Sequence, residues 1–261
     1  MLRMVAEVGV DCLQLGLNPV MRGAWPVDGL RGRFEDHGIS IRSGMIGMRG
    51  EDYTSPRTIR ETGGIRPTKH WKANLKAAKD CARVAKQLDI PLVSFHAGFV
   101  PHDACDPERA LLVERLGLFA DVFADEGVLL ALETGQETAA TLLDVLAQLD
   151  RGNVVVNFDP ANMLLYGMGD PVQALADLLP HVRQVHVKDA IASKAPGAWG
   201  SEVVVGLGQV DWKAFFRQLE GAVGDVELMI EREAGHDRVG DMRNARDYLL
   251  SMGVAEETHA R

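Results

Sequence analysis

The sequence predicts an α/β barrel of the TIM type, and three observations lead to that prediction. Short apolar runs alternate with longer stretches of helical spacing, which is the pattern of repeated βα units. These runs are apolar on both faces, as expected of parallel strands that are covered by helices. Polar residues end at least four of the runs, as expected where side chains converge on the C-terminal mouth of a barrel.

Seven runs are predicted to be strands, at residues 12–17, 39–47, 91–96, 128–133, 154–159, 182–187 and 227–231. Helices are predicted at residues 2–8, 69–88, 107–126, 138–149, 172–179, 212–219 and 237–252. A complete (β/α)8 barrel has eight strands. We therefore expect a chain that begins inside the first helix and lacks the first strand, for which a shortened chain or an open barrel are alternative explanations.

The length of the chain favours a single domain over residues 1–261, with a frayed tail at about 254–261. Two domains are allowed by length, but α/β barrels commonly run to about 250 residues as one domain. A doubly wound dinucleotide-binding sheet has little support, because no glycine-rich phosphate loop follows the first strand.

Charge and cysteine content narrow the function and the compartment. The formal net charge of -9 argues against a nucleic-acid partner, whose phosphates need a basic surface. Cys12, Cys81 and Cys105 are few, odd in number and far apart, so we expect a reducing cytoplasm rather than a disulfide framework. No segment approaches the roughly 18 apolar residues of a membrane span, and we expect no membrane partner.

Four strand ends carry residues that can bind a metal ion: Glu133, Asp159, His186 and Glu231. Taken singly, each has an ordinary alternative, since strand-end acids often cap helices and a histidine on a strand is more often a core residue. Together, the charges gathered at one mouth would repel one another without a cation. Three carboxylates and one imidazole suit Mn²⁺, with Mg²⁺, Co²⁺ or Zn²⁺ as alternatives.

Several motifs resemble the xylose isomerase-like TIM-barrel superfamily, in its sugar phosphate isomerase/epimerase branch. The similarity runs from about Gly9 to Met252. The segments that carry it are Ser94-Phe-His-Ala-Gly-Phe, Glu133-Thr-Gly-Gln-Glu, Asn157-Phe-Asp-Pro-Ala-Asn, Val185-His-Val-Lys-Asp, Gly206-Leu-Gly-Gln-Val-Asp-Trp and Ile230-Glu-Arg-Glu-Ala-Gly. In combination they are specific for the superfamily, but only weakly specific for a substrate.

The resemblance implies a metal-dependent isomerase or epimerase that acts on a small carbohydrate. Glu133 and Glu231 would bind the metal and also exchange a proton with a substrate carbon beside a carbonyl, through a metal-stabilised enediolate. Enzymes of this type often form homodimers, which leaves a homodimer as an open expectation. The remaining polar residues predicted to contact the substrate are His96, Asn162, Lys188, Asp189 and Gln136.

Each of these contact residues has a structural alternative. His96 could equally be a core histidine bonded to the backbone, and Lys188 and Asp189 could form ordinary salt bridges. Gln136 could support Glu133 or simply precede the next helix. Trp199 could wall a sugar pocket, whereas Trp212 has the spacing of a core residue.

Two departures from the family pattern argue against a standard free-ketose epimerase. Asn162 stands where those enzymes usually carry a histidine, and Ala192 stands where they usually carry an arginine. Two other functions therefore stay open, and a third is disfavoured. A metal-dependent dehydratase or lyase on a keto-cyclitol or keto-glycoside would use the same two bases, and a degenerate, non-catalytic barrel would serve as a binding subunit. The DNA-repair chemistry of endonuclease IV is disfavoured, because it needs extra histidines that are missing here.

Overall fold

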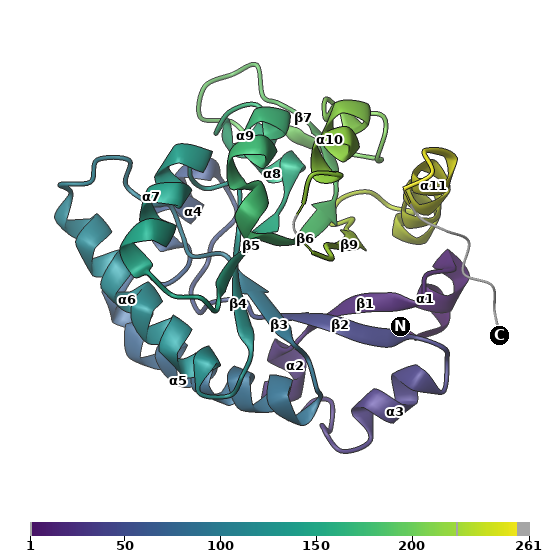
Figure 1. Ribbon diagram of the computed structural model, residues 1–261, viewed down its shortest axis with the longest axis horizontal. Coiled ribbons are helices and arrows are strands. Elements are labelled where there is room, and N and C mark those ends of the chain that lie inside the picture. The colour runs from purple at the N-terminus through teal and green to yellow at the C-terminus, as the bar shows by residue number, and fades with distance from the viewer. Residues whose placement is uncertain (1, 223, 255–261) are drawn as a thin grey trace.

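Seven parallel strands form the wall of the barrel in the computed structural model, which describes residues 2–222 and 224–254. Their spatial order follows the chain, with helices between successive strands (Figure 1). The strands are β1 (Cys12–Gly16), β2 (Ser40–Met45), β3 (Leu92–Phe95), β4 (Leu129–Glu133), β5 (Val154–Phe158), β6 (Val182–Val187) and β9 (Glu227–Ile230). The predicted TIM-type barrel and its seven strands are confirmed.

All of the helices predicted from the sequence form, and their ends lie within two residues of the predicted bounds. They are α1 (Leu2–Val8), α5 (Thr68–Gln87), α6 (Pro107–Ala124), α7 (Ala139–Leu149), α9 (Pro171–Leu178), α10 (Trp212–Leu219) and α11 (Arg238–Ser251). The further helical segments of the described chain lie between the predicted strands and helices and were not predicted. They are α2 (Asn18–Met21), α3 (Leu30–Glu35), α4 (Pro56–Thr62), α8 (Pro160–Tyr166) and the 3-10 turn η1 (Leu179–His181).

The core lies between the strands and their outer helices. All five residues of β5 are buried, which explains why its sequence shows no alternation of apolar and polar residues. Phe95 on β3 stacks on Phe119 of α6, with ring centroids 5.3 Å apart. Strand β4 pairs in parallel with β3 on one side and with β5 on the other. The C-terminal ends of these three strands therefore reach the same side of the barrel.

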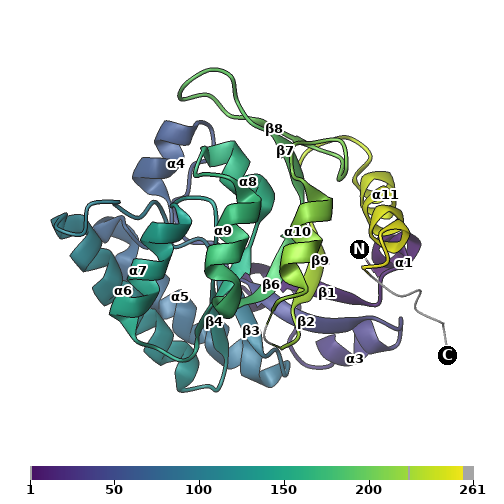
Figure 2. The same cartoon turned by 45° about the horizontal axis from the view of Figure 1, so that its top comes forward.

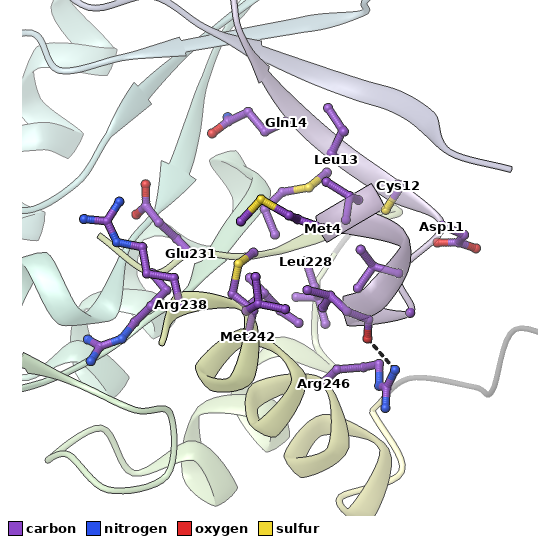
Figure 3. Close-up of a pocket in the computed structure, with 18 of the residues that line it drawn as sticks. Met4, Asp11, Cys12, Leu13, Gln14, Leu228, Glu231, Arg238, Met242 and Arg246 are labelled. Carbon is purple, nitrogen blue, oxygen red and sulfur yellow. Dashed lines mark hydrogen bonds between the residues drawn. The ribbon is translucent and has the colours of Figure 1, made fainter. Parts of the chain in front are cut away.

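The barrel is open between β1 and β9. In the described part of the chain, β1 pairs only with β2, and β9 pairs only with β6. A cavity of about 880 Å³ lies between these two strands, and its lining includes Met4, Leu13, Leu228 and Met242 (Figure 3). Helices α1 and α11 pack together beside it (Figures 1 and 2). We call this opening the β1/β9 gap.

A hairpin stands above the mouth of the barrel. It lies between the predicted strand at residues 182–187 and the predicted helix at residues 212–219, where the sequence predicts a long loop. Its strands are β7 (Asp189–Ile191) and β8 (Ser201–Val203), which pair antiparallel (Figure 2). The hairpin connects β6 to the loop before α10, so it hangs over the C-terminal ends of the barrel strands.

None of the helices in the described ranges has the length and apolarity that crossing a bilayer requires. Of the predicted frayed tail, residues 255–261 lie outside the part of the chain that the structure describes.

Candidate metal centre and active site

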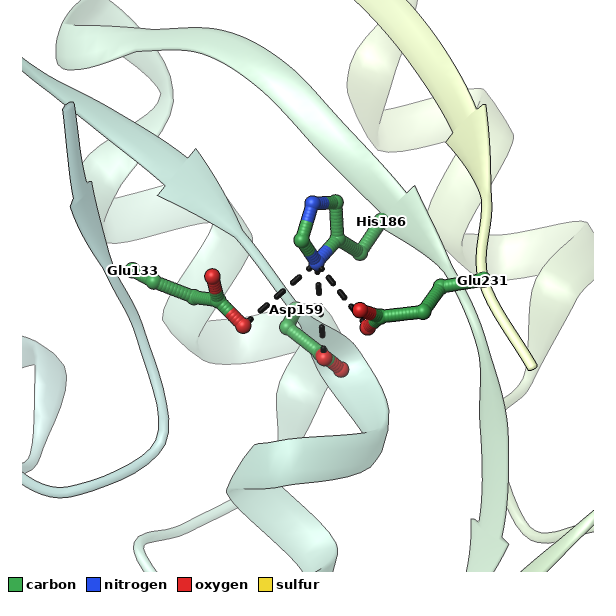
Figure 4. A group of neighbouring side chains, drawn as sticks. All are labelled: Glu133, Asp159, His186 and Glu231. Atoms are coloured by element: carbon green, nitrogen blue, oxygen red, sulfur yellow. Dashed lines mark ion pairs between the residues drawn. The ribbon is translucent and has the colours of Figure 1, made fainter. Parts of the chain in front are cut away.

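Four neighbouring strands bring the predicted metal ligands to one point. Glu133 is the last residue of β4, and Asp159 directly follows β5, where it also caps α8 through the backbone N–H of Asn162. His186 lies next to the end of β6, and Glu231 directly follows β9. Figure 4 shows the three carboxylates grouped around the imidazole, with Glu133 and Glu231 approaching from opposite sides.

The spacing of these groups suits one metal ion. One ligand atom from each residue lies within 4.8 Å of the others. From Nδ1 of His186, the nearest carboxylate oxygens are 3.1 Å away on Glu231, 3.4 Å on Glu133 and 3.9 Å on Asp159. Ligands about 2.1 Å from a shared divalent ion are separated by about 3–4 Å, which matches these distances.

Two buried atoms of the cluster have no hydrogen-bond partner among the described residues, namely Nδ1 of His186 and Oδ2 of Asp159. Buried polar atoms are normally satisfied, so two orphans that face one another need an explanation. Both belong to the predicted ligand set. The residues present therefore fit a divalent cation, which would accept one lone pair from each atom.

The charge states of the cluster indicate a shortage of positive charge. Burial raises the pKa of Asp159 to about 7. Burial alone would lower the pKa of His186, but the carboxylates of Glu231 and Glu133 outweigh it and hold that pKa well above its usual value. Without a cation, the cluster thus recruits protons to offset its carboxylates. A divalent metal ion would take over that task.

The tautomer of His186 is set by Gln14 on β1. Oε1 of Gln14 lies 3.0 Å from Nε2 of His186, while the amide of Gln14 donates to Ser94. Asn157 also lies 3.0 Å from Nε2, but its amide donates to Glu133. Because the carbonyl of Gln14 can only accept, this contact requires a proton on Nε2, and Nδ1 is the ring nitrogen that could bind a metal ion in place of the proton that it otherwise holds.

Lys188 is a buried cation at the edge of the cluster. Its ammonium lies 3.1 Å from Glu231, 2.7 Å from Glu233 and 3.6 Å from Asp159. Burial alone would lower the pKa of Lys188, but these three carboxylates outweigh it and raise that pKa well above its ordinary value. Lys188 therefore offsets part of the negative charge and helps hold Glu231 ionised.

A cavity of about 500 Å³ opens above the cluster and reaches Glu133 and Glu231. His96 and Asn162 also line it, and both hold Glu133. Nε2 of His96 lies 3.3 Å from Oε1 of Glu133, and the amide of Asn162 donates to the same oxygen at 3.2 Å. Three aromatic side chains form another part of the wall: Tyr53, Tyr166 and Trp199.

Three of the predicted contact residues do not line this cavity: Lys188, which is buried beside the cluster, Gln136 and Asp189. The amide of Gln136 lies behind the wall and donates to the hydroxyl of Tyr166 at 3.4 Å. The carboxylate of Asp189 accepts from the indole of Trp212 and from the backbone of Ala190, Gly206, Gly208 and Val210. Asp189 thus organises the segment around the hairpin, and its position gives it no direct contact with a molecule in the cavity.

Some residues of the site were not singled out from the sequence. Gln14 is a polar residue within an apolar strand. Its position indicates that its side chain makes a buried polar contact, but the sequence does not identify the residue that it contacts. Glu51, Tyr53 and Tyr166 line the cavity from loop or helix-end positions. Nothing in their local sequence distinguishes them from surface residues.

Comparison with known proteins agrees with this arrangement. Residues 2–252 match the family described as xylose isomerase-like TIM barrel. The chain belongs to this family. A xylose isomerase domain protein from Planctomyces limnophilus is 31% identical, with a TM-score of 0.88 over 97% of this chain and 91% of that one.

Two solved structures below 25% identity are similar to this chain in fold alone. One from Mycobacterium smegmatis, solved in complex with magnesium, has 22% identity and a TM-score of 0.72 over 97% of this chain and 88% of its own. An L-ribulose 3-epimerase has 17% identity and a TM-score of 0.73 over 97% and 87%. Uncharacterized protein YihM of Escherichia coli is 26% identical over 123 residues, which are 46% of this chain and only 37% of YihM.

Proposed function

We propose that this protein is a divalent-metal-dependent isomerase or epimerase of a keto-sugar. One observation carries the proposal: Glu133 and Glu231 approach the same small volume from opposite sides, beside a buried group of further metal-binding residues (Figure 4). The sugar epimerases with the same fold support the choice of substrate class. The oxygen-rich ligand set favours Mn²⁺, with Mg²⁺, Co²⁺ or Zn²⁺ as alternatives.

Glu133, Asp159, His186 and Glu231 would hold the ion, which would polarise the carbonyl of a bound ketone as a Lewis acid. One of the two glutamates then takes a proton from the carbon beside the carbonyl, and the electron pair moves onto the carbonyl oxygen. If the opposite glutamate returns a proton to the other face, the carbon is epimerised. If the same glutamate returns it to the former carbonyl carbon, while the hydroxyl proton of the first carbon passes to the former carbonyl oxygen, the product is an isomer.

The surroundings of the two glutamates keep both carboxylates ready to accept a proton. Burial alone would raise the pKa of each. For Glu133, nearby His96 and His186 outweigh burial and lower the pKa. For Glu231, His186 and Lys188 do the same. The lowered pKa values favour the ionised form, so either glutamate can serve as the base toward its own face of the substrate, and the opposite glutamate must carry the proton that it returns.

Solvent deuterium tests this proposal. Metal-loaded protein is incubated in D₂O with ketoses and 3-keto-glycosides, and the carbon beside the carbonyl is followed by NMR and mass spectrometry. We expect deuterium incorporation with an isomeric product, reduced at least about 100-fold in Glu133→Gln and Glu231→Gln. The matched control is Glu61→Gln, an exposed glutamate on α4 that pairs with Arg57.

Other outcomes point to the alternatives. Exchange followed by loss of a leaving group, with an unsaturated product, would assign the site to a dehydratase or lyase. Metal binding without exchange on any of these compounds would contradict an enzyme of this mechanism and favour a binding subunit.

A further inference from the structure

The charges around the cavity identify the class of substrate. Five glutamates line it, at positions 51, 133, 202, 231 and 233, and neither lysine nor arginine does so among the described residues. His96 is the one basic side chain on this wall, and it is already paired with Glu133 at 3.3 Å. The charged side chains of the cavity wall are therefore almost all acidic.

The nearest cations are engaged elsewhere. Lys188 is almost fully buried between Glu231, Glu233 and Asp159. Arg232 does not line the cavity, and it donates to Glu202 and Asp241 at 2.8 Å each. Neither can turn to an anion in the cavity without leaving its own carboxylate unpaired.

Two of the wall glutamates are fixed by the backbone. The carboxylate of Glu51 accepts from the N–H groups of Met48 and Gly64. The carboxylate of Glu202 accepts from the N–H groups of Glu233 and Ala234, in addition to Arg232. Because these bonds hold the acids in place, the wall cannot lose its negative character by a simple side-chain rotation.

A bound divalent ion does not reverse this balance. Three ligand carboxylates exceed the charge of one such ion, and Lys188 is shared with Glu233, which is itself negative. A phosphate or carboxylate on the substrate would therefore enter a partly desolvated cavity that offers it no lysine or arginine, beside a metal ion whose charge its own carboxylate ligands already exceed. Hydroxyl groups, in contrast, can donate to every one of these carboxylates.

The aromatic part of the wall suits the apolar face of a sugar. Tyr166 meets Trp199 edge-to-face at a centroid distance of 5.1 Å, and Tyr53 lies 6.5 Å from His96. Such rings offer apolar contact area together with polar edges, as polyhydroxylated ligands require.

We propose that the substrate is an uncharged polyhydroxy ketone, a free ketose or keto-glycoside, and not a sugar phosphate or a keto acid. This inference rests on the proposed function, and it assigns a chemical class to the molecule that the two glutamates act on.

Binding, measured separately from turnover, tests the inference. Mn²⁺-loaded protein is titrated in a calorimeter with L-ribulose and D-fructose, and with the terminal phosphate ester of each. We expect the free ketoses to bind at least about tenfold more tightly than their esters, with no competition from inorganic phosphate. Equal or tighter binding of the esters would overturn the inference, as would the absence of binding by both free ketoses and by a 3-keto-glycoside titrated in the same way. Binding of free ketoses without deuterium exchange would instead overturn the proposed function and leave the substrate class standing.

A positive charge added to the cavity wall tests whether the phosphate esters are excluded by electrostatic repulsion or by the shape of the cavity. Ala234 lines the cavity and is exposed, so Ala234→Arg places a cation there, and Ala234→Gln is the matched uncharged control. We expect the arginine variant to recover much of the affinity for the phosphate esters, and the glutamine variant to reject them as the parent protein does. Equal rejection by both variants would mean that shape excludes the esters, and would contradict the electrostatic argument.

Discussion

The side-chain carbonyl of Gln14 on β1 lies 3.0 Å from Nε2 of His186 on β6, across 172 positions of the sequence. This contact directs Nδ1 of His186 toward Glu133, Asp159 and Glu231. It also links the proposed metal site to one of the two strands that border the β1/β9 gap (Figure 3). The edge of the open barrel therefore contributes to the geometry of the site.

Removing the carbonyl of Gln14 should weaken metal binding. In Gln14→Leu, we expect the affinity for Mn²⁺ to fall by about 10- to 100-fold, because the imidazole loses the partner that fixes its tautomer. Titration calorimetry of metal-free protein with Mn²⁺ measures this. Gln148→Leu makes the same chemical change on the exposed face of α7. Equal affinities in the two variants would show that Gln14 does not orient the ligand.

Lys188 should stabilise the metal-free protein far more than a surface lysine does. In Lys188→Met, three carboxylates lose their shared cation, and we expect the free energy of unfolding to fall by about 3 kcal/mol. Lys86→Met removes an exposed partner of Glu126 and should cost at most about 1 kcal/mol. Urea unfolding with and without Mn²⁺ measures both. Added metal should recover part of the loss in Lys188→Met; similar costs in the two variants would contradict this role.

Glu137 should make stability depend on pH. Burial raises the pKa of Glu137 to about 8, whereas an unfolded glutamate titrates near about 4.3. The folded state therefore keeps a proton that the unfolded chain has released. The contribution of Glu137 to stability is full below about pH 4.3 and is lost progressively as the pH rises toward about 8.

Because glutamine cannot ionise, Glu137→Gln should gain stability over the parent protein between pH 5 and pH 8. The gain should be no more than about 1.4 kcal/mol per pH unit. Urea unfolding at both pH values measures it, with Glu61→Gln as an exposed control. A difference from the parent protein that stays constant with pH would show that Glu137 is not held protonated.

The β1/β9 gap should be visible in hydrogen exchange. Within residues 2–222 and 224–254, each of these strands pairs on one side only, whereas β4 and β5 pair on both. We expect the amides of β1 and β9 to exchange at least about tenfold faster than those of β4 and β5. Mass spectrometry of peptides from the four strands measures this. Equal protection would mean that the edges of the gap are covered.

The fold and the four proposed ligands could be predicted from the sequence because each depends on local patterns. Buried parallel strands show as apolar runs, and Glu133, Asp159, His186 and Glu231 stand at or next to the ends of four such runs. Asp159 could even be recognised beside Pro160 as the start of a helix. The convergence of the four strand ends then follows from barrel topology alone.

The remaining parts of the site depend on the path of the loops, which no local pattern specifies. Asp189 was predicted to contact substrate, yet five donors from its own segment and from Trp212 surround its carboxylate. Tyr53 and Tyr166 come from separate segments and meet only in the folded chain. Gln14 lies on a strand that was predicted, but its contact with His186 on β6 depends on how two distant strands are placed in the barrel.

Metal content is the most direct test of the proposed centre. Protein stripped with a chelator is equilibrated with Mn²⁺, dialysed, and analysed for bound metal alongside Glu231→Ala. We predict one ion per chain in the parent protein and a loss of at least about 100-fold in affinity in the variant, because one ligand is removed from a buried set of four. No uptake by the parent protein, or undiminished uptake by Glu231→Ala, would contradict the assignment of these four residues to one metal centre.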